Sequence, residues 1–294
     1  DGIRDRSPSR GLGDVYKRQD IESVAFYDKP VLKFERLLDN YIGVAPRGLF
    51  SFLDVIPKWI HKRLWVKDEI KKHLKGFKGE IIFPEHHMSH AAHTFFTSPF
   101  DEAAILTVDG VGEWSTTTFG TGKDTDIKLI NDIRWPHSVG LFYSAFTYFL
   151  GFKVNEGEYK LMGLAAYGEP QYAEIIREKL IDVRPDGSYR LNSEYFGFID
   201  SDIMTNDRFH ELFGGEPRHP ESRITKREMD LAASIQVVLE EAVLLLAQRA
   251  KELTNSPHLV LAGGVALNCV ALSLIHISEP TRRTPISYAV FCLK

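Results

Sequence analysis

The pattern of apolar and polar positions predicts a chain that mixes strands with helices. Apolar, β-branched runs that end at glycine, proline or a charged residue are typical of strands. They lie at residues 21–28, 79–84, 103–110, 113–122, 126–135 and 257–262. Apolar residues at helical spacing predict helices at residues 30–42, 48–65, 66–77, 138–152, 171–181 and 226–253. The expected fold class is therefore α/β.

Some stretches allow a more specific prediction. Residues 103–135 carry three successive strand patterns with glycine-rich turns, which predicts a β-meander, and residues 186–196 predict a hairpin or short strand. Pro57 predicts a break in its helix, because proline lacks the N–H that the helix needs. "NEGEYKLMGLAAYGEP", residues 155–170, combines glycines with charged residues and predicts a loop, either shaped around a ligand or simply solvated.

Composition narrows the class of protein. The 294 residues are 44% hydrophobic and 26% charged, enough for one large or two small globular domains. A net charge of -4 without a basic block argues against nucleic acid or an anionic membrane as partner and favours small molecules. Two cysteines, Cys269 and Cys292, favour a reducing compartment. With no apolar run of roughly 18 residues and no signal-like start, the expected location is the cytoplasm.

Both ends of the chain look foreign to it. Residues 1–19 and 273–294 resemble peptides that arise when sequencing-adapter DNA is translated together with a natural reading frame. We therefore expect the natural segment to cover residues 20–272 and to be cut at both ends. The alternative is a basic arm at the start and a short strand at the end.

Four histidines lie close together in "PEHHMSHAAHTFF", residues 84–96. On a helix, His86 and His90 stack on one face, near enough to share a metal ion, with His93 close to that face. His87 points about 100° away. Imidazole suits late divalent metals, although histidines at this spacing are more often surface or hydrogen-bonded residues. A zinc peptidase is disfavoured because that motif places glutamate directly after the first histidine, where this chain has His87.

Two glycine-containing turns could form binding sites for an anion. In "LTVDGVGEWSTTTFG", residues 106–120, a strand ends at Asp109 and a second strand returns with Ser115, Thr116 and Thr117, so backbone N–H groups and hydroxyls at the tip could hold a phosphate. An ordinary hairpin would use the same residues. In "LVLAGGVALN", residues 259–268, two glycines follow a buried strand where a nucleotide could approach the backbone, or where the chain simply turns tightly.

Taken together, these motifs resemble a known family. "HHMSHAAHTFFTSPF", "LTVDGVGEWSTTTFG", "PHSVGLFYSAFTYFLGFKVNEGEYKLMGLAAYGEP" and "LAGGVALNCVA" resemble the O-carbamoyltransferases of the nodulation-protein and aminoglycoside type, over residues 20–272. The resemblance implies an incomplete Kae1-like domain of the actin/Hsp70/sugar-kinase-like (ASKHA) ATPase fold. It also implies that His86 and His90 bind a divalent metal, with iron the expected ion. The implied nucleotide-binding residues are Asp109, Gly110, Gly112, Ser115, Thr116, Gly263, Gly264 and Asn268.

The resemblance also implies a reaction. A second, YrdC-like domain, which we expect to be missing from this chain, makes carbamoyl-adenylate from ATP and carbamoyl phosphate. The domain present here then passes the carbamoyl group to a hydroxyl of a sugar, aminoglycoside or other secondary metabolite. Asp109, Glu156 and His87 are three candidates for the base that accepts the hydroxyl proton, and the sequence does not rank them.

The chain also departs from the family pattern. The opening phosphate hairpin and an acidic third metal ligand, expected after "GGVALN", are absent, so we expect this chain alone to bind metal weakly and to catalyse little. Another ASKHA-fold transferase or kinase, including one that transfers threonylcarbamoyl to tRNA, remains an alternative. A nucleotide- or metal-sensing module without catalysis is a second alternative, from a different class.

Overall fold

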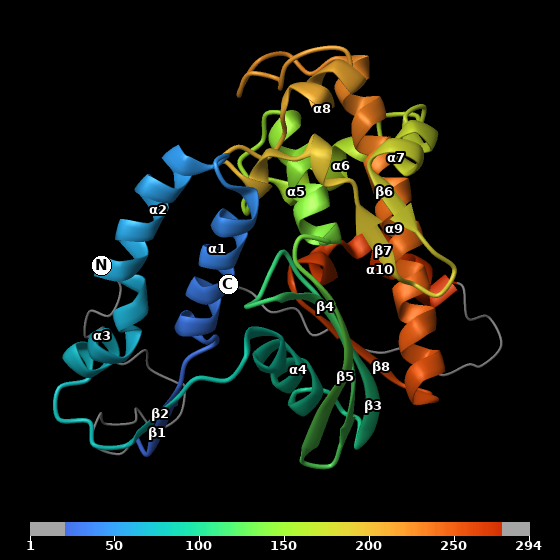
Figure 1. Ribbon diagram of the computed structural model, residues 1–294. Helices are drawn as coiled ribbons and strands as arrows, with labels where there is room; N and C mark the ends of the chain where they lie inside the picture. The colour runs from blue at the N-terminus through green and yellow to red at the C-terminus, as the bar shows by residue number, and fades with distance from the viewer. Residues whose placement is uncertain (1–20, 278–294) are drawn as a thin grey trace, which may run out of the picture.

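The computed structural model describes residues 21–277 as a mixed α/β fold (Figure 1). The strands are β1 Ser23–Ala25, β2 Glu80–Ile82, β3 Glu102–Val108, β4 Ser115–Lys123, β5 Asp126–Arg134, β6 Ile181–Val183, β7 Tyr189–Leu191 and β8 Leu259–Ala262. The helices are α1 Pro30–Val44, α2 Leu49–His61, α3 Val66–His73, α4 His86–Phe96, α5 Val139–Phe149, α6 Glu158–Ala165, α7 Ala173–Lys179, α8 Asp207–Leu212, α9 Lys226–Thr254 and α10 Cys269–Ile277.

The central sheet has the strand order β5-β4-β3-β8. Strands β3, β4 and β5 are antiparallel neighbours, which confirms the predicted meander. Strand β8 lies parallel to β3, with Leu106 opposite Leu261, although about 150 residues separate them in the chain. This parallel pair brings the chain after β3 and the glycine pair after β8 to the same edge of the sheet.

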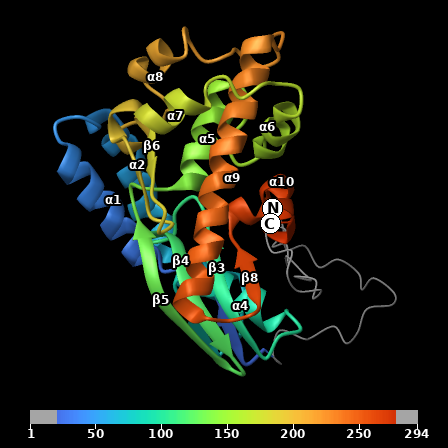
Figure 2. The ribbon, with the colours of Figure 1, turned by 90° about the vertical axis from the view of Figure 1, so that its right-hand side faces the viewer.

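Helices cover both faces of the sheet, as Figures 1 and 2 show. Ala103 and Ile105 of β3 pack in one apolar cluster with Phe95 of α4. Leu106 and Val108 belong to the larger cluster on the other face, which contains the apolar side of α9. Because strand side chains alternate between faces, β3 holds the histidine helix on one side and the main core on the other.

A second, two-stranded sheet joins the start of the chain to the histidine helix. Strand β1 pairs in parallel with β2, with Val24 opposite Ile81, and helices α1, α2 and α3 connect them. The pairing places the residues just after β1 beside those that begin α4. The start of α1 therefore lies close to the histidines.

Two predictions about helices were wrong. Helix α2 continues through Pro57 to His61. Ile56 and Trp59 are both buried beside the proline, and burying two large apolar side chains, at about 1.5–3 kcal/mol each, offsets the roughly 3 kcal/mol that an internal proline costs.

The glycine-containing stretch at residues 155–170 is likewise not a loop throughout, because residues Glu158–Ala165 form α6. Leu161 is fully buried in the main core, and α6 packs on α9. The burial of one leucine outweighs the cost of about 1 kcal/mol for a glycine inside a helix. The predicted strand within residues 186–196 is confirmed as β7, which pairs with β6.

Most of the two segments predicted to be foreign, residues 1–19 and 273–294, lies outside the described residues. The exception is residues 273–277, which continue α10, and Ile275 is buried in the main core. Within residues 21–277, none of the helices combines the length and apolarity needed to cross a membrane.

Glu228, in the first turn of the long helix α9, should stabilise the fold through its charge. Glu228 Oε2 accepts hydrogen bonds from the backbone N (2.8 Å) and the hydroxyl (2.5 Å) of Thr225. We expect Glu228→Ala to lower the free energy of unfolding by about 1 kcal/mol, because a capping-box carboxylate and its favourable position at the helix N-terminus are lost. Urea unfolding measures this change.

The pH dependence of the same variant tests whether the stabilisation comes from the ionised carboxylate of Glu228. Burial raises the pKa of Glu228, but the hydrogen bonds from Thr225 outweigh it, and the pKa is lowered from 4.5. A carboxyl with a lowered pKa stabilises above its unfolded pKa and loses that contribution as the pH falls through the folded pKa. The difference between wild type and Glu228→Ala should therefore shrink below about pH 4.5. Glu252→Ala, in the last turn of α9, is the control and should change stability by less than about 0.5 kcal/mol.

Candidate metal centre

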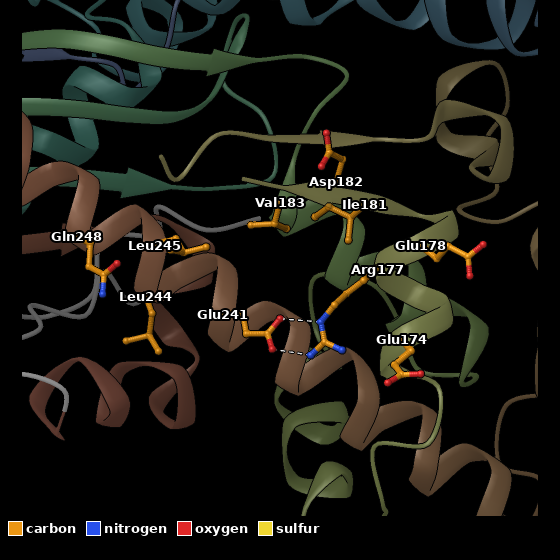
Figure 3. A pocket seen from close by; sticks show the side chains of 10 residues that line it. All are labelled: Glu174, Arg177, Glu178, Ile181, Asp182, Val183, Glu241, Leu244, Leu245 and Gln248. Atoms are coloured by element: carbon orange, nitrogen blue, oxygen red, sulfur yellow. Dashed lines mark hydrogen bonds and ion pairs between the residues drawn. The ribbon is translucent and has the colours of Figure 1, made fainter. Parts of the chain in front are cut away.

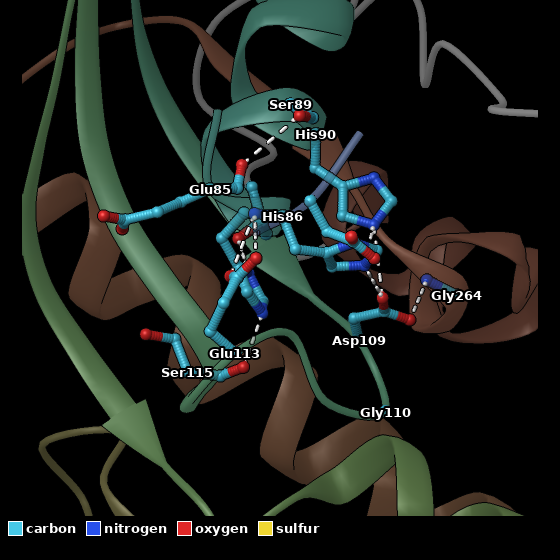
Figure 4. A network of polar contacts seen from close by, with 12 residues as sticks. Glu85, His86, Ser89, His90, Asp109, Gly110, Glu113, Ser115 and Gly264 are labelled. Carbon is cyan, nitrogen blue, oxygen red and sulfur yellow. Dashed lines mark hydrogen bonds and ion pairs between the residues drawn. The ribbon is translucent and has the colours of Figure 1, made fainter. Parts of the chain in front are cut away.

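Two histidines of α4 and an aspartate that follows β3 converge on one point (Figure 4). Asp109 Oδ2 lies 2.7 Å from His86 Nε2 and 3.2 Å from His90 Nε2, and the two Nε2 atoms are 3.1 Å apart. All three side chains are partly buried, with 12%, 16% and 21% of the side chains of His86, His90 and Asp109 exposed. The cluster is therefore enclosed on most sides yet open to solvent.

The fold explains why these residues meet. His86 is the first residue of α4, so His90 stands one turn later on the same face. Asp109 directly follows β3, on the sheet edge where β8 also ends. Its Oδ1 accepts a hydrogen bond from the backbone N of Gly264, at 3.0 Å. The aspartate thus links the histidine helix to the glycine pair.

The electrostatics suit a cation. Burial by itself raises the pKa of Asp109, but hydrogen bonds and charge from His86 and His90 lower it well below its ordinary value, so the carboxylate is ionised at neutral pH. The Nδ1 atom of His86 is buried without a hydrogen-bond partner. Two imidazole nitrogens and a carboxylate oxygen converging within 4.8 Å of one another match the donor set of two-histidine, one-carboxylate iron sites. The residues present therefore fit a divalent metal.

The other two histidines of α4 lie away from this cluster. His87 is buried, with Nδ1 2.5 Å from the Thr107 hydroxyl and Nε2 2.8 Å from the Ser115 carbonyl oxygen. Burial lowers its pKa to about 4, so it is neutral. Because both ring nitrogens are engaged within the protein, His87 has no free nitrogen to act as a base. His93 is exposed.

Glu156, the glutamate predicted as a candidate base, does not join the cluster. Its carboxylate is exposed and lies 2.5 Å from Lys153 Nζ. Nearby Glu158 is turned inward, where it accepts hydrogen bonds from the Ser144 hydroxyl and the Asn155 backbone N. Of the three predicted bases, only Asp109 belongs to the cluster with His86 and His90.

The hairpin between β3 and β4 differs from the prediction in one respect. The hydroxyls of Ser115 and Thr116 donate to Asp132 Oδ2 (2.7 Å) and to the carbonyl oxygen of His137 (2.5 Å). Thr116 and Thr117 are fully buried, so the expected exposure of these hydroxyls at the tip was wrong. Thr116 donates to backbone carbonyl oxygens, and the Thr117 hydroxyl pairs with that of Tyr189, so both hydroxyls are engaged within the protein.

The glycines of this hairpin pack close to the site. The Gly110 carbonyl oxygen accepts a hydrogen bond from the Ser138 hydroxyl, at 2.6 Å. A Cβ on Gly112 would lie only 2.9 Å from the ring of His87 and 3.1 Å from Cβ of His86. Glycine at position 112 therefore lets the hairpin rest directly on the histidines.

In the turn after β8, two glycines lie close to the backbone and side chain at the end of β3. Gly263 has φ +98°, and Gly264, whose N–H reaches Asp109, is exposed. Asn268 is buried and pairs with Gln236 of α9 while its Oδ1 accepts from Ala271 N, so its side chain caps α10. The two glycines thus lie beside the cluster of His86, His90 and Asp109, whereas the side chain of Asn268 serves the packing of α9 and α10.

Sequence reasoning did not place Asp109 with the histidines and did not single out Glu113. The buried carboxylate of Glu113 contacts the backbone N of His86, at 3.0 Å. The available signal was the position of Asp109 at the end of a strand parallel to β8, but that pairing is not visible in the sequence.

A groove elsewhere in the described residues contains none of the predicted site residues. It has a volume of about 1010 Å³ and lies between α7, β6 and α9 (Figure 3). Its one arginine, Arg177, forms an ion pair with Glu241 across the groove. Because the arginine of this groove is already paired, the cluster of His86, His90 and Asp109 remains the candidate functional site.

Comparison with known proteins identifies the family. The family described as "Carbamoyltransferase N-terminus" matches residues 13–282, a range that overlaps both segments predicted to be foreign. The Synechocystis protein sll1178 is 50% identical over 260 residues, which is 86% of this chain and 42% of that protein. Nodulation protein NolNO of Sinorhizobium fredii is 33% identical over 189 residues, 64% of this chain and 26% of that protein.

Two further similarities are more distant. Nodulation protein NolO of Bradyrhizobium diazoefficiens is 30% identical over 184 residues, covering 63% of this chain and 31% of that protein. The crystal structure of T. kodakarensis HypF covers 73% of this chain and 34% of that chain at 15% identity, with a TM-score of 0.36. The chain thus spans less than half the length of these relatives. The match over residues 13–282 places this chain in the carbamoyltransferase family, within the region that forms the N-terminus of its members.

Proposed function

We propose that this chain is part of an O-carbamoyltransferase that transfers a carbamoyl group from carbamoyl-adenylate to a hydroxyl of a sugar, aminoglycoside or other secondary metabolite. The observation that carries the proposal is the convergence of His86, His90 and Asp109 in a member of the carbamoyltransferase family. The carbamoyl-adenylate would come from ATP and carbamoyl phosphate, in a YrdC-like domain of the longer protein. Within this proposal the mixed α/β fold is an incomplete Kae1-like, ASKHA-type domain.

The metal proposed for the centre is iron. His86, His90 and Asp109 would hold it through Nε2 and carboxylate oxygen atoms. A bound divalent ion supplies Lewis acidity and positive charge next to an adenylate phosphate or the carbamoyl carbonyl. Two histidines with one carboxylate leave coordination positions open for such oxygens.

The backbone around Asp109 would position the substrate. The Gly110–Gly112 turn and the Gly263–Gly264 turn meet at the same edge of the sheet, where the Asp109 to Gly264 hydrogen bond ties them together. Glycines in both turns allow an anionic ligand to come close to backbone N–H groups. Rate enhancement would then come mainly from holding a weakly nucleophilic hydroxyl against an activated carbonyl.

The proposal leaves the base to a residue other than His87 or Glu156. His87 is neutral but has both ring nitrogens occupied, and the exposed carboxylate of Glu156 is paired with Lys153. Asp109 serves better as a metal ligand, because one oxygen faces the histidines while the other accepts from Gly264. Base and acceptor contacts would come from the bound ligands or from the rest of the longer protein.

The test uses the full-length protein that carries residues 20–272. It is incubated with ATP, radiolabelled carbamoyl phosphate and a panel of sugars, aminoglycosides and other alcohols. We expect label to appear on an acceptor hydroxyl only when divalent metal is present, with loss on chelation and recovery on adding Fe²⁺. A matched reaction with threonine, bicarbonate and tRNA tests threonylcarbamoyl transfer.

Other outcomes would favour the alternatives. Transfer that needs tRNA would replace O-carbamoylation by threonylcarbamoylation. Retained nucleotide binding without label transfer to any acceptor would favour a nucleotide- or metal-sensing module. Within this chain, a net charge of -4 without a basic block gives no compositional support to a tRNA substrate.

A further inference from the structure

A buried glutamate lies directly beneath the metal-binding helix (Figure 4). Glu113, in the turn before β4, accepts the backbone N–H of His86 with both carboxylate oxygens, at 3.2 and 3.0 Å. Its Oε1 also accepts the backbone N–H of Lys29, at 2.8 Å. The same carboxylate therefore holds the first residue of α4 and the residue just before α1.

This arrangement is unusual because Glu113 is buried, with only 6% of the residue exposed. A buried carboxylate is costly unless it is hydrogen-bonded. Here it meets the N-terminal N–H groups of two helices, whose dipoles both favour a negative charge. Helix α4 has no other side-chain cap, since Glu85 at its N-cap position makes no capping hydrogen bond. Glu113 is thus the group that anchors the start of the metal-binding helix.

A buried arginine supplies the opposite charge. Arg36 of α1 is 7% exposed, makes no hydrogen bond through its buried Nε, and lies over the ring of Trp135 at 5.0 Å. Trp135 is itself fixed by a hydrogen bond to Asn40 of α1. Burial lowers the pKa of Arg36 to about 10, and the negative charge of Glu113 opposes this shift and favours the charged guanidinium. The pair balances charge where α1, the hairpin and α4 meet.

The hairpin that carries Glu113 also touches the histidine side chains. A Cβ on neighbouring Gly112 would come within 3.1 Å of Cβ of His86. A shift of Glu113 would therefore move both the backbone and the side chain of His86. In the cluster the ring of His86 places Nε2 2.7 Å from Asp109 Oδ2.

We propose that Glu113 is a positioning residue for the metal centre, which fixes the direction of the His86 ring by anchoring the first turn of α4 to α1 and to the β3–β4 hairpin. The inference rests on the proposed function, because it assumes that His86, His90 and Asp109 bind a metal. It assigns Glu113 no contact with the metal or the substrate.

The experiment compares Glu113→Gln with Glu85→Gln in the 294-residue chain. Both changes remove one carboxylate near His86, but Glu85 is exposed and pairs with the Lys29 ammonium instead of the His86 N–H. Co²⁺ affinity is measured by titration, and the visible absorption spectrum at saturation reports ligand geometry. We expect Glu113→Gln to weaken Co²⁺ binding by about 10–100-fold, as loss of an orienting partner typically does, and to change the spectrum. Glu85→Gln should change neither.

Glu113→Asp separates geometry from charge. Aspartate keeps the negative charge near Arg36 but is one methylene shorter, so it cannot hold both N–H groups. We expect weaker binding and an altered spectrum again. Wild-type affinity and spectrum in a folded Glu113→Gln or Glu113→Asp protein would overturn the proposal. Failure of both variants to fold under conditions where Glu85→Gln folds would also overturn it, because Glu113 would then support the fold as a whole.

The result is distinguishable from failure of the metal site itself. If His86→Ala and His90→Ala leave Co²⁺ binding unchanged, the metal centre is wrong and the proposed function loses its main support. If those two variants abolish binding while both Glu113 variants behave as wild type, only the positioning role is wrong.

Discussion

His86→Ala and His90→Ala are each expected to abolish stoichiometric metal binding. The two Nε2 atoms and Asp109 Oδ2 form one cluster, so removing either imidazole leaves two donors, too few to hold a divalent ion in a partly exposed position. The loss of affinity should exceed the roughly 10–100-fold typical of residues that only orient a ligand. Metal content after dialysis, measured by elemental analysis, and Fe²⁺ titration give the result.

His93→Ala is the matched control, since it removes an imidazole from the same helix at an exposed position outside the cluster. It should retain metal. Asp109→Asn tests the third ligand: the amide can still accept from Gly264 N but carries no charge, so affinity should fall as it does for the histidine variants. Metal retained in both histidine variants, or lost equally in His93→Ala, would contradict the assignment.

The sequence predicted the helices and strands better than the tertiary contacts between them. Periodicity identified the meander, the long helix α9 and the histidine helix because those signals are local. It failed at Pro57 and at α6, where burial of Ile56, Trp59 and Leu161 outweighs the local preference of proline and glycine. Tertiary packing decides those cases, and it is not encoded in the spacing of neighbouring residues.

In the candidate site, too, local features could be predicted from the sequence and tertiary contacts could not. The spacing of His86 and His90 is a property of one helix and could be predicted. The contribution of Asp109 depends on β3 lying parallel to β8 and on α4 covering that edge, so it required the structure. Glu113 was hidden for the same reason, because its partners are backbone N–H groups 27 and 84 residues away. A backbone contact of this kind leaves no motif.

Gly263→Ala should be the most destabilising single change near the site. Gly263 has φ +98°, which an L side chain rarely adopts, and a Cβ there would lie 2.2 Å from the carbonyl oxygen of Val108 and 2.7 Å from its carbon. These are backbone atoms of β3 and cannot rotate away. We expect the free energy of unfolding, measured in urea, to fall by about 3 kcal/mol or more, since strain and a forced separation of two strands add together.

Gly163→Ala is the control for this glycine. It lies within α6 with nothing within 4 Å of a new Cβ, so it should leave stability unchanged or raise it by up to about 1 kcal/mol through helix propensity. Because Val108 immediately precedes Asp109, Gly263→Ala should also weaken metal binding, whereas Gly163→Ala should not. A Gly263→Ala protein that unfolds within about 0.5 kcal/mol of wild type would show that β3 and β8 do not meet this closely, and the linkage of Asp109 to Gly264 would fail with it.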